Sequence, residues 1–569
     1  MGNPRILLLV ALGFIMMLMW QAWQEDYGPK PASTVLTGDT ATQQFEQSQG
    51  ADAVEVAEIS PSDNDDLPTL SSESELARST ALQQHQAEKT RSTSNNYINV
   101  ITDVLEVKVN PRGGEISGVA LKDYPVSLEQ PDTPFEFLHT TADKLYVAQS
   151  GILSAHEAPN HFAHYQAESF EYRLAEGVDS IRVPLVWRDD SGMEIVKTLI
   201  FSRGSHVIDI EYQIKNKSAD PWQGRQYRQL VRRPQEQEQG IGMIYTFNGA
   251  AYYSDEDKFE KIDFDDIDDR AMSKDVKGGW VGMIEHYFVS SWIPDQNEMN
   301  NFYTRKMKKG RYAIGMISPE ISVAAGKTGE FTSRLYAGPK SQHVLEQLAP
   351  GLKLSVDYGW LTIIAQPIFW LMEFIYKYIV SNWGWAIILL TLSIKLMFFK
   401  LSEYGYRSMA NMRRVQPKMV ALKERYGSDK QRMQQGMMEL YRKEKINPMS
   451  GCFPILIQIP VFIALYWVLL ESVELRQAPF MLWIKDLSVQ DPYFVLPLIM
   501  GITMFIQQKL NPAPMDETQQ MIMKVLPVVF TFFFLFFPAG LVLYWVVNNV
   551  LSIAQQWVIT RRIEAGAAK

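Results

Sequence analysis

Long apolar segments constrain this chain more than any other feature of its sequence. A helix needs about 20 mostly apolar residues, rising 1.5 Å each, to cross about 30 Å of hydrocarbon. Six segments meet or nearly meet this length: 6–23, 383–401, 451–470, 493–510, 521–537 and 540–560. No such segment occurs in residues 24–350, which have the composition of soluble protein. The sequence therefore predicts a multi-domain membrane protein with six α-helical spans.

The first apolar segment has two alternative interpretations, a cleaved signal peptide or a membrane anchor. Arg5 precedes an apolar core, as in secretory signals. However, the segment ends in bulky residues (MMLMWQAWQ) and offers no small-x-small cleavage site. We therefore predict that residues 1–23 form an uncleaved N-terminal anchor.

The charges of the short loops predict the orientation of these spans. Residues 403–449 carry eleven Lys and Arg against five Asp and Glu, and three more basic residues follow Thr560. The loop between the third and fourth spans is acidic instead. Because positively charged loops remain in the cytoplasm, both termini and residues 403–449 are predicted to be cytoplasmic, and residues 24–360 external.

Residues 351–382 are apolar and aromatic, and they could form a seventh span. A seventh span would reverse every later loop and place residues 403–449 outside. We therefore predict an interfacial amphipathic helix here. Residues 383–569 then form a five-span core with a basic, methionine-rich helical hairpin at 403–449. This hairpin suits either varied apolar partners or simple contact with lipid head groups.

The exported part contains two kinds of sequence. Residues 24–96 are rich in Gln, Ser, Thr, Asp and Glu and poor in aromatic residues, which is typical of a flexible acidic tether. From Tyr97 onward, apolar and polar residues alternate in short runs separated by Gly, Pro, Asn and Asp. The clearest runs are 104–109, 181–187, 195–201, 207–214, 302–307 and 312–317. This alternation predicts an all-β sandwich over residues 97–350.

The β region shows no convincing catalytic, metal or cofactor site. His161 and His164 lack a second pair of ligands, so we interpret them as surface residues. Gly326-Lys327-Thr328 is similar to the end of a phosphate-binding loop, but Ile321 stands where that loop requires glycine. The acidic residues of 255–269 lack the spacing of an EF-hand and are predicted to form a solvated loop.

Lys395 is a charged residue deep within an apolar segment. An ammonium group near the membrane centre costs about 2.5–3.5 kcal/mol on insertion scales, so it needs a hydrated cavity or a partner. Alternatively, its stem could reach the cytoplasmic interface, as we expect for Lys400. Because Lys395 lies a dozen residues into the segment, the sequence favours the hydrated cavity.

Polar residues in other spans could line the same cavity. Thr391 lies one helical turn before Lys395, Gln458 lies in the third span, and Asn548 lies in the last span. Interhelical hydrogen bonds, worth about 0.6 kcal/mol each, are the alternative role for such residues. A cavity that contains a cation and no carboxylate is suited to bind an anionic ligand rather than to relay protons.

Several short motifs occur in order along the second half of the chain: DYGW (357–360), QPK (416–418), NP (447–448) with GCFP (451–454), SVELRQAP (472–479) and FPAGLVLY (537–544). Through these motifs the whole sequence resembles the YidC family of membrane-protein insertases of Gram-negative inner membranes. The resemblance implies an insertase and chaperone rather than an enzyme, without a cofactor and with a large periplasmic domain. It also implies that nascent transmembrane segments pass from a hydrated, positively charged groove into lipid, alone or with the Sec translocon.

The resemblance also assigns roles to individual residues. Lys395 stands where the family usually has arginine, so the charge is kept but the bidentate fork is lost. Thr391, Gln458 and Asn548 are expected to line the groove. An aromatic pair, Tyr544 and Trp545, is expected to contact the entering segment.

The implied partners are nascent membrane proteins, the Sec translocon, ribosome–nascent-chain complexes and membrane lipids, but no nucleic acid. The tail after Arg562 is short and weakly basic, which argues against strong ribosome docking through it. The β domain is similar to sugar-mutarotase-like folds, and this likeness implies no catalysis.

Two other classes of protein are less consistent with the sequence. A transporter would need a coupling-ion site, and neither an intramembrane carboxylate nor a repeated broken-helix pattern supports one. A membrane-anchored sugar-modifying enzyme would need convergent acid–base groups in the β domain, and none can be nominated.

Overall fold

The computed structural model describes residues 67–68, 97–141, 144–234, 246–427, 429–444, 453–511 and 517–567. The chain divides into two compact units, Met1–Glu58 and Ile59–Lys569, and all described residues belong to the second. The predicted N-terminal anchor, nearly all of the tether and the motif at 447–448 lie outside the described residues.

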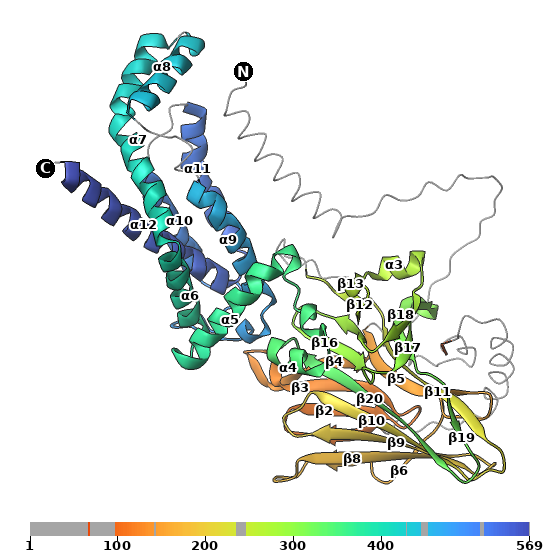
Figure 1. The fold of residues 1–569 in the computed structure, drawn as a ribbon. Coiled ribbons are helices and arrows are strands. Elements are labelled where there is room, and N and C mark those ends of the chain that lie inside the picture. Colours follow the sequence, from red (N-terminus) through yellow and green to blue (C-terminus); the bar gives the residue numbers. More distant parts are fainter. Residues whose placement is uncertain are drawn as a thin grey trace, which may run out of the picture. The chain divides into compact units, whose positions relative to one another are not determined.

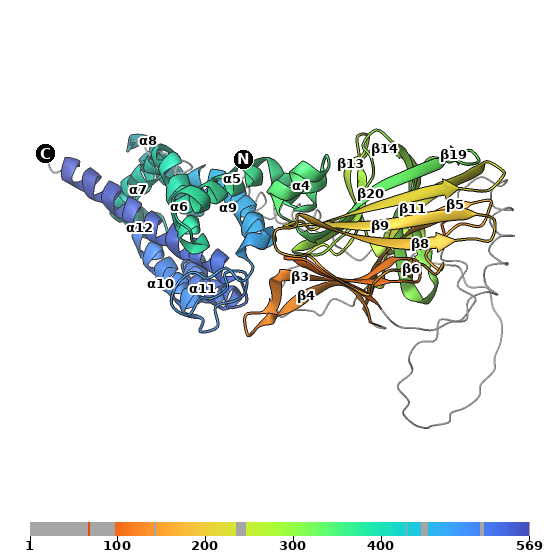
Figure 2. The same ribbon diagram turned by 90° about the horizontal axis from the view of Figure 1, so that it is seen from below.

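Two β-sheets make up the β domain (Figures 1 and 2). In spatial order, the first contains β14 (Ser273–Lys277), β17 (Met299–Met307), β18 (Arg311–Ile317), β11 (Trp222–Arg232), β5 (Leu145–Ser154), β4 (Gln130–Thr140), β3 (Glu115–Ser127), β2 (Leu105–Asn110), β1 (Ile98–Ile101) and β7 (Glu171–Arg173). A further strand, β19 (Ile321–Val323), pairs with β11. The second sheet contains β13 (Lys258–Ile262), β12 (Gly249–Ser254), β15 (Trp280–Ile284), β16 (Phe288–Ile293), β20 (Thr328–Pro339), β10 (Val207–Asn216), β9 (Met193–Ser202), β8 (Ser180–Arg188) and β6 (Gln166–Ala167).

The sandwich forms because successive side chains of a strand point to opposite faces. In β9 every second residue is buried, starting with Met193, and β2 shows the same alternation. The buried residues of both sheets share one apolar core, and the two layers are separate in Figure 2, with β3 and β4 in one and β8 and β9 in the other. The predicted strands and their two-layer packing are therefore confirmed.

Two predictions within the β domain are wrong. His161 is only 4% exposed and lies inside the domain, not at its surface. The acidic segment 255–269 is not simply a solvated loop, because it contains the strand β13 and the helix α3 (Phe264–Asp269). Its carboxylates pair with lysines from neighbouring strands, as in Asp257–Lys274 and Asp268–Lys306, both at 2.7 Å. The described residues contain no cluster of metal-ligating side chains.

The helices follow the sandwich in the chain, and the segments predicted as later spans are helical (Figure 1). Their bounds are α4 (Gln342–Leu348), α5 (Thr362–Tyr378), α6 (Trp383–Met397), α7 (Phe399–Tyr426), α8 (Lys430–Lys443), α9 (Phe453–Glu471), α10 (Val495–Leu510), α11 (Glu517–Phe534) and α12 (Ala539–Ala567). The segment predicted as a helical hairpin contains α7 and α8, which pack against each other. The segment predicted as one span to residue 401 instead breaks at Phe398, where α6 and α7 meet at 69°. The last helix also continues past residue 560, where the predicted span ended.

Length and hydropathy single out one helical segment of the described residues, Gly359–Tyr378, as able to cross a membrane by itself. The bent pair α6–α7 would count as a second crossing if it were one broken span, and the apolar parts of α9, α10 and α11 are shorter. Along α5, Ile363 and Trp370 are exposed while Ile368 and Met372 are buried. The interfacial position of α5 and the number of spans therefore remain predictions.

Polar contacts join the residue that follows β20, and the loop between β15 and β16, to the C-terminal end of α9. Lys340 and Glu471 form an ion pair of 2.9 Å, and both side chains are almost fully buried. Beside them, His286 Nε2 lies 2.9 Å from the carbonyl oxygen of Leu470. Residues of the second sheet and of α5, α6, α9 and α12 also share one apolar cluster.

Candidate functional site

Helix α12 holds the predicted polar residues together, because it packs against α6, α7, α9 and α10 (Figure 1). The start of α6 is fixed by Asn382, whose side chain accepts a hydrogen bond from the Trp385 amide at 3.1 Å. The same side chain donates to the carbonyl oxygens of Pro479 and Phe480. This N-cap satisfies an otherwise unpaired helix amide and sets where α6 begins.

Lys395 extends from the last turn of α6 toward α12. Its Nζ lies 2.8 Å from Ser552 Oγ, and this hydroxyl donates to the carbonyl oxygen of Asn548 at 2.7 Å. No ion pair among the described residues involves Lys395. By contrast, the side chain of Lys400 is 93% exposed, as expected for a residue at an interface. Lys395 therefore has hydroxyl groups rather than a carboxylate as its neighbours.

The polar contacts continue from Asn548 to α9. Gln458 Nε2 donates to Asn548 Oδ1 at 3.0 Å, and the side chain of Tyr544 lies beside that of Gln458. The side chain of Tyr406, from α7, lies beside Ser552. We call this set the Lys395 network; its members are Lys395, Tyr406, Gln458, Tyr544, Asn548 and Ser552. It connects α6, α7, α9 and α12.

Two of the predicted residues lie outside this network. Thr391 is buried, and its hydroxyl donates to the carbonyl oxygen of Ile387 one turn earlier at 2.7 Å. Trp545 packs edge-on against Phe462 and Phe534, with ring centroids 4.8 and 5.5 Å apart. Its indole Nε1 is buried and has no hydrogen-bond partner among the described residues.

Sequence reasoning missed the contribution of Tyr406, and it named Ser552 only among several polar residues of the last span that could line the groove. Ser552 lies four residues after Asn548, and this spacing places both on one face of α12. Tyr406 lies in the segment that was assigned to a cytoplasmic hairpin, so nothing local indicated its contact with α12. Other polar residues of α12 have the alternative role, that of interhelical hydrogen bonding. Asn549 donates to Thr503 of α10, and Gln556 donates to Asn511, the residue that follows α10.

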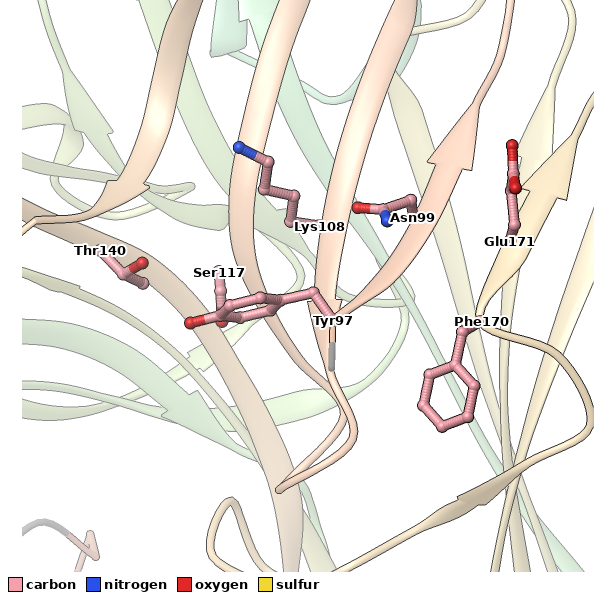
Figure 3. Close-up of a pocket in the computed structure, with 7 residues that line it drawn as sticks. All are labelled: Tyr97, Asn99, Lys108, Ser117, Thr140, Phe170 and Glu171. Atoms are coloured by element: carbon pink, nitrogen blue, oxygen red, sulfur yellow. The ribbon is translucent and has the colours of Figure 1, made fainter. Parts of the chain in front are cut away.

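The β domain contains a separate pocket of about 570 Å³ between β1 and its neighbours (Figure 3). Its lining combines aromatic, hydroxyl, amide and charged side chains: Tyr97, Asn99, Lys108, Ser117, Thr140, Phe170 and Glu171. Lys108 and Glu171 extend from different strands on either side of Asn99 (Figure 3). The pocket thus lacks a pair of adjacent acid–base groups.

A β sandwich followed by a set of apolar helices with a lysine inside defines a membrane protein with a large β domain. Residues 97–371 match the family model of the YidC periplasmic domain, and residues 374–566 match that of the 60Kd inner membrane protein. The chain belongs to the YidC family.

Relatives of similar length are named Membrane protein insertase YidC. That of Methylococcus capsulatus is 50% identical over 571 residues and that of Thioalkalivibrio sulfidiphilus 48% over 580, with complete coverage of both chains in each case. The structure is also similar to the crystal structure of an active YidC insertase with its first transmembrane domain resolved. That match has 18% identity and a TM-score of 0.37, and covers 81% of this chain and 92% of the other.

Proposed function

We propose that this chain is a membrane-protein insertase of the bacterial inner membrane, and that it is not an enzyme. In this proposal it moves nascent transmembrane segments from a hydrated groove beside Lys395 into the lipid bilayer. The observation that carries it is the position of Lys395, an amine inside the helical part with hydroxyl neighbours and, among the described residues, no carboxylate partner.

The Lys395 network explains how this charge is tolerated and used. A lysine ammonium has three N–H donors, and Ser552 accepts one of them. The other two can bind water at rest and an acidic group of the client during insertion. At an effective dielectric constant of about 20, opposite charges 4 Å apart attract by about 4 kcal/mol, which offsets part of the cost of bringing a carboxylate into the membrane.

The aromatic residues next to the network suit the apolar part of a client. Tyr544, Trp545, Phe462 and Phe534 come from α9, α11 and α12 and lie in ring contact with one another. Tyr544 and Phe534 are buried, whereas Phe462 and Trp545 are partly exposed. A client helix would pass along the two exposed rings into lipid, driven by apolar burial at about 25 cal/mol per Å². Thr391, Gln458 and Asn548 would line the polar side of the path. No covalent bond changes, and no cofactor is needed.

The remaining predictions complete the proposal. Six spans would place both termini and the hairpin α7–α8 in the cytoplasm, the β domain in the periplasm and α5 in the outer interface. The exposed basic side chains of this hairpin, such as Arg407 and Lys418, suit nascent chains, ribosomes and lipid head groups. The weakly basic tail would add little to ribosome contact. The chain would act alone or beside the Sec translocon.

Insertion in cells depleted of their own insertase tests the role of Lys395. The client carries a short acidic translocated tail, and protease protection of that tail measures insertion. We expect Lys395→Ala to abolish insertion and Lys395→Arg to retain it, because only the alanine variant lacks the positive charge. Lys400→Ala is the matched control, because that exposed lysine lies five residues further on. Full insertion by a stably expressed Lys395→Ala chain would refute the proposed charge attraction.

A further inference from the structure

A short piece of the predicted tether is packed against the β domain. Leu67 is only 7% exposed and forms a cluster with Tyr227, Tyr303 and Ile317. These residues belong to β11, β17 and β18, which are adjacent strands of the first sheet. Phe302, next to Tyr303, lies in the core between the sheets. Because neighbouring residues of a strand face opposite ways, Leu67 occupies the outer face of this sheet.

A polar contact holds the same segment. Arg305 of β17 donates from Nη1 to the carbonyl oxygen of Leu67 at 2.6 Å. The remaining nitrogens of this guanidinium, Nε and Nη2, are buried and have no partner in the described part of the chain. A buried guanidinium with unused N–H groups is suited to donate hydrogen bonds to further acceptors, above all carboxylates.

Positive charge accumulates around this contact. His161 packs against Phe162 of the same cluster, and its Nδ1 lies 2.6 Å from the hydroxyl of Tyr227. Burial, together with the nearby charges of Arg305 and Arg112, lowers the pKa of His161 to about 3. Arg112 also lies over the Phe162 ring, at 5.2 Å from its centroid. The site that Leu67 contacts is therefore apolar, with the guanidinium groups of Arg305 and Arg112 beside it, while His161 is neutral.

The sequence around Leu67 complements these charges. Residues 60–70 read SPSDNDDLPTL, so three aspartates stand within the four residues before Leu67. Pro68, which is also buried, has a restricted backbone and no N–H group that would need a partner. Such a segment loses little conformational freedom when it binds.

We propose that this outer-face patch of the first sheet is a peptide-binding site whose occupant is the chain's own acidic Asp-Leu-Pro segment. Leu67 packs into the apolar cluster, Arg305 binds its carbonyl group, and the aspartates would complement the guanidinium groups of Arg305 and Arg112. Docking would attach the middle of the tether to the β domain, so that only residues 24–66 connect the N-terminal apolar segment to it. This inference does not depend on the insertase function.

A competition experiment on the full-length chain in lipid nanodiscs tests the site. The probe is a fluorescein-labelled peptide of residues 60–70, and its fluorescence anisotropy measures binding. In the native chain the tethered segment competes at an effective concentration of about 1 mM. We therefore expect the Leu67→Asp chain, whose own segment is released, to bind the peptide at least tenfold more tightly than the native chain. The same peptide with aspartate in place of Leu67 serves as the control and should not bind.

Arg305→Ala, added to the Leu67→Asp chain, should weaken peptide binding about tenfold, because the donor to the carbonyl group is lost. Equal binding by the native and Leu67→Asp chains, or no binding to either, would overturn the proposal.

Crosslinking gives a second measurement, and it does not require the Leu67→Asp substitution that releases the chain's own segment. In a Cys452→Ser background, cysteines at Leu67 and Leu153 should be joined efficiently by a short bismaleimide, because both residues belong to the same cluster. A pair at Leu82 and Leu153, with the first cysteine elsewhere in the tether, is the control. Peptide mass spectrometry measures the yields, and equal yields for the two pairs would contradict docking at Leu67.

Discussion

The buried ion pair between Lys340 and Glu471 leads to a quantitative prediction. Both side chains are at most 5% exposed, and their 2.9 Å contact joins the end of β20 to the end of α9. Removing one partner of a buried pair leaves an uncompensated charge and costs about 3–5 kcal/mol. Lys340→Met keeps most of the apolar stem and removes only the ammonium group. We therefore expect this single substitution to destabilise the contact by at least about 3 kcal/mol.

Hydrogen exchange measures this loss locally, without requiring reversible unfolding of a membrane protein. Every 1.4 kcal/mol is a factor of ten, so amides that exchange through opening of this contact should exchange about 100-fold faster in Lys340→Met. The peptides to follow cover residues 337–345 and 464–475, and peptides from β9 serve as an internal reference.

The double variant Lys340→Met with Glu471→Gln is the matched control. Because it removes both charges, it should recover most of the lost protection. Native exchange rates in the single variant would refute the reasoning, as would a double variant as labile as the single one.

Two further predictions concern the β domain and the start of α6. Glu194 accepts hydrogen bonds from Lys215 and Arg188, which lower its pKa to about 2. A carboxyl whose folded-state pKa is depressed adds stability above its unfolded pKa, near 4.5, and this stability is lost as the pH falls toward 2. The thermal midpoint of the native chain should therefore fall more between pH 5 and 3 than that of Glu194→Gln, and parallel curves would contradict this. Gly384→Ala would drive a methyl group into the ring of Phe480, which typically costs about 1–3 kcal/mol. A lower thermal midpoint is expected, whereas Ala386→Gly, two residues further along α6, tests whether any change at the start of this helix has the same effect.

Local patterns explain why much of the fold was predictable. The alternation in 195–201 and 207–214 depends only on the two-residue repeat of a strand, so β9 and β10 were expected where they occur. The later helices could likewise be located from the lengths of their apolar segments. A long apolar segment must be removed from water wherever it lies in the fold, so this requirement depends on the segment alone. Lys395 stood out because a charge within such a segment is costly wherever it folds.

Residues whose roles depend on distant partners could not be predicted. His161 is buried by strands and charges from far along the chain, including Tyr227 and Arg305. Nothing in the local sequence indicated that helix α6 breaks at Phe398. That break directs α7 so that Tyr406 reaches Ser552, about 150 residues later.

By itself, the sequence determined the kinds of element, the apolar segments and the isolated charge, since these follow from periodicity and from the solvation of individual side chains. Tertiary structure alone decided which hydroxyl groups surround Lys395 and where the acidic segment at Leu67 packs. The physical reason is that a hydrogen bond or a buried contact depends on the distance between atoms of different segments. No single segment of the sequence determines that distance.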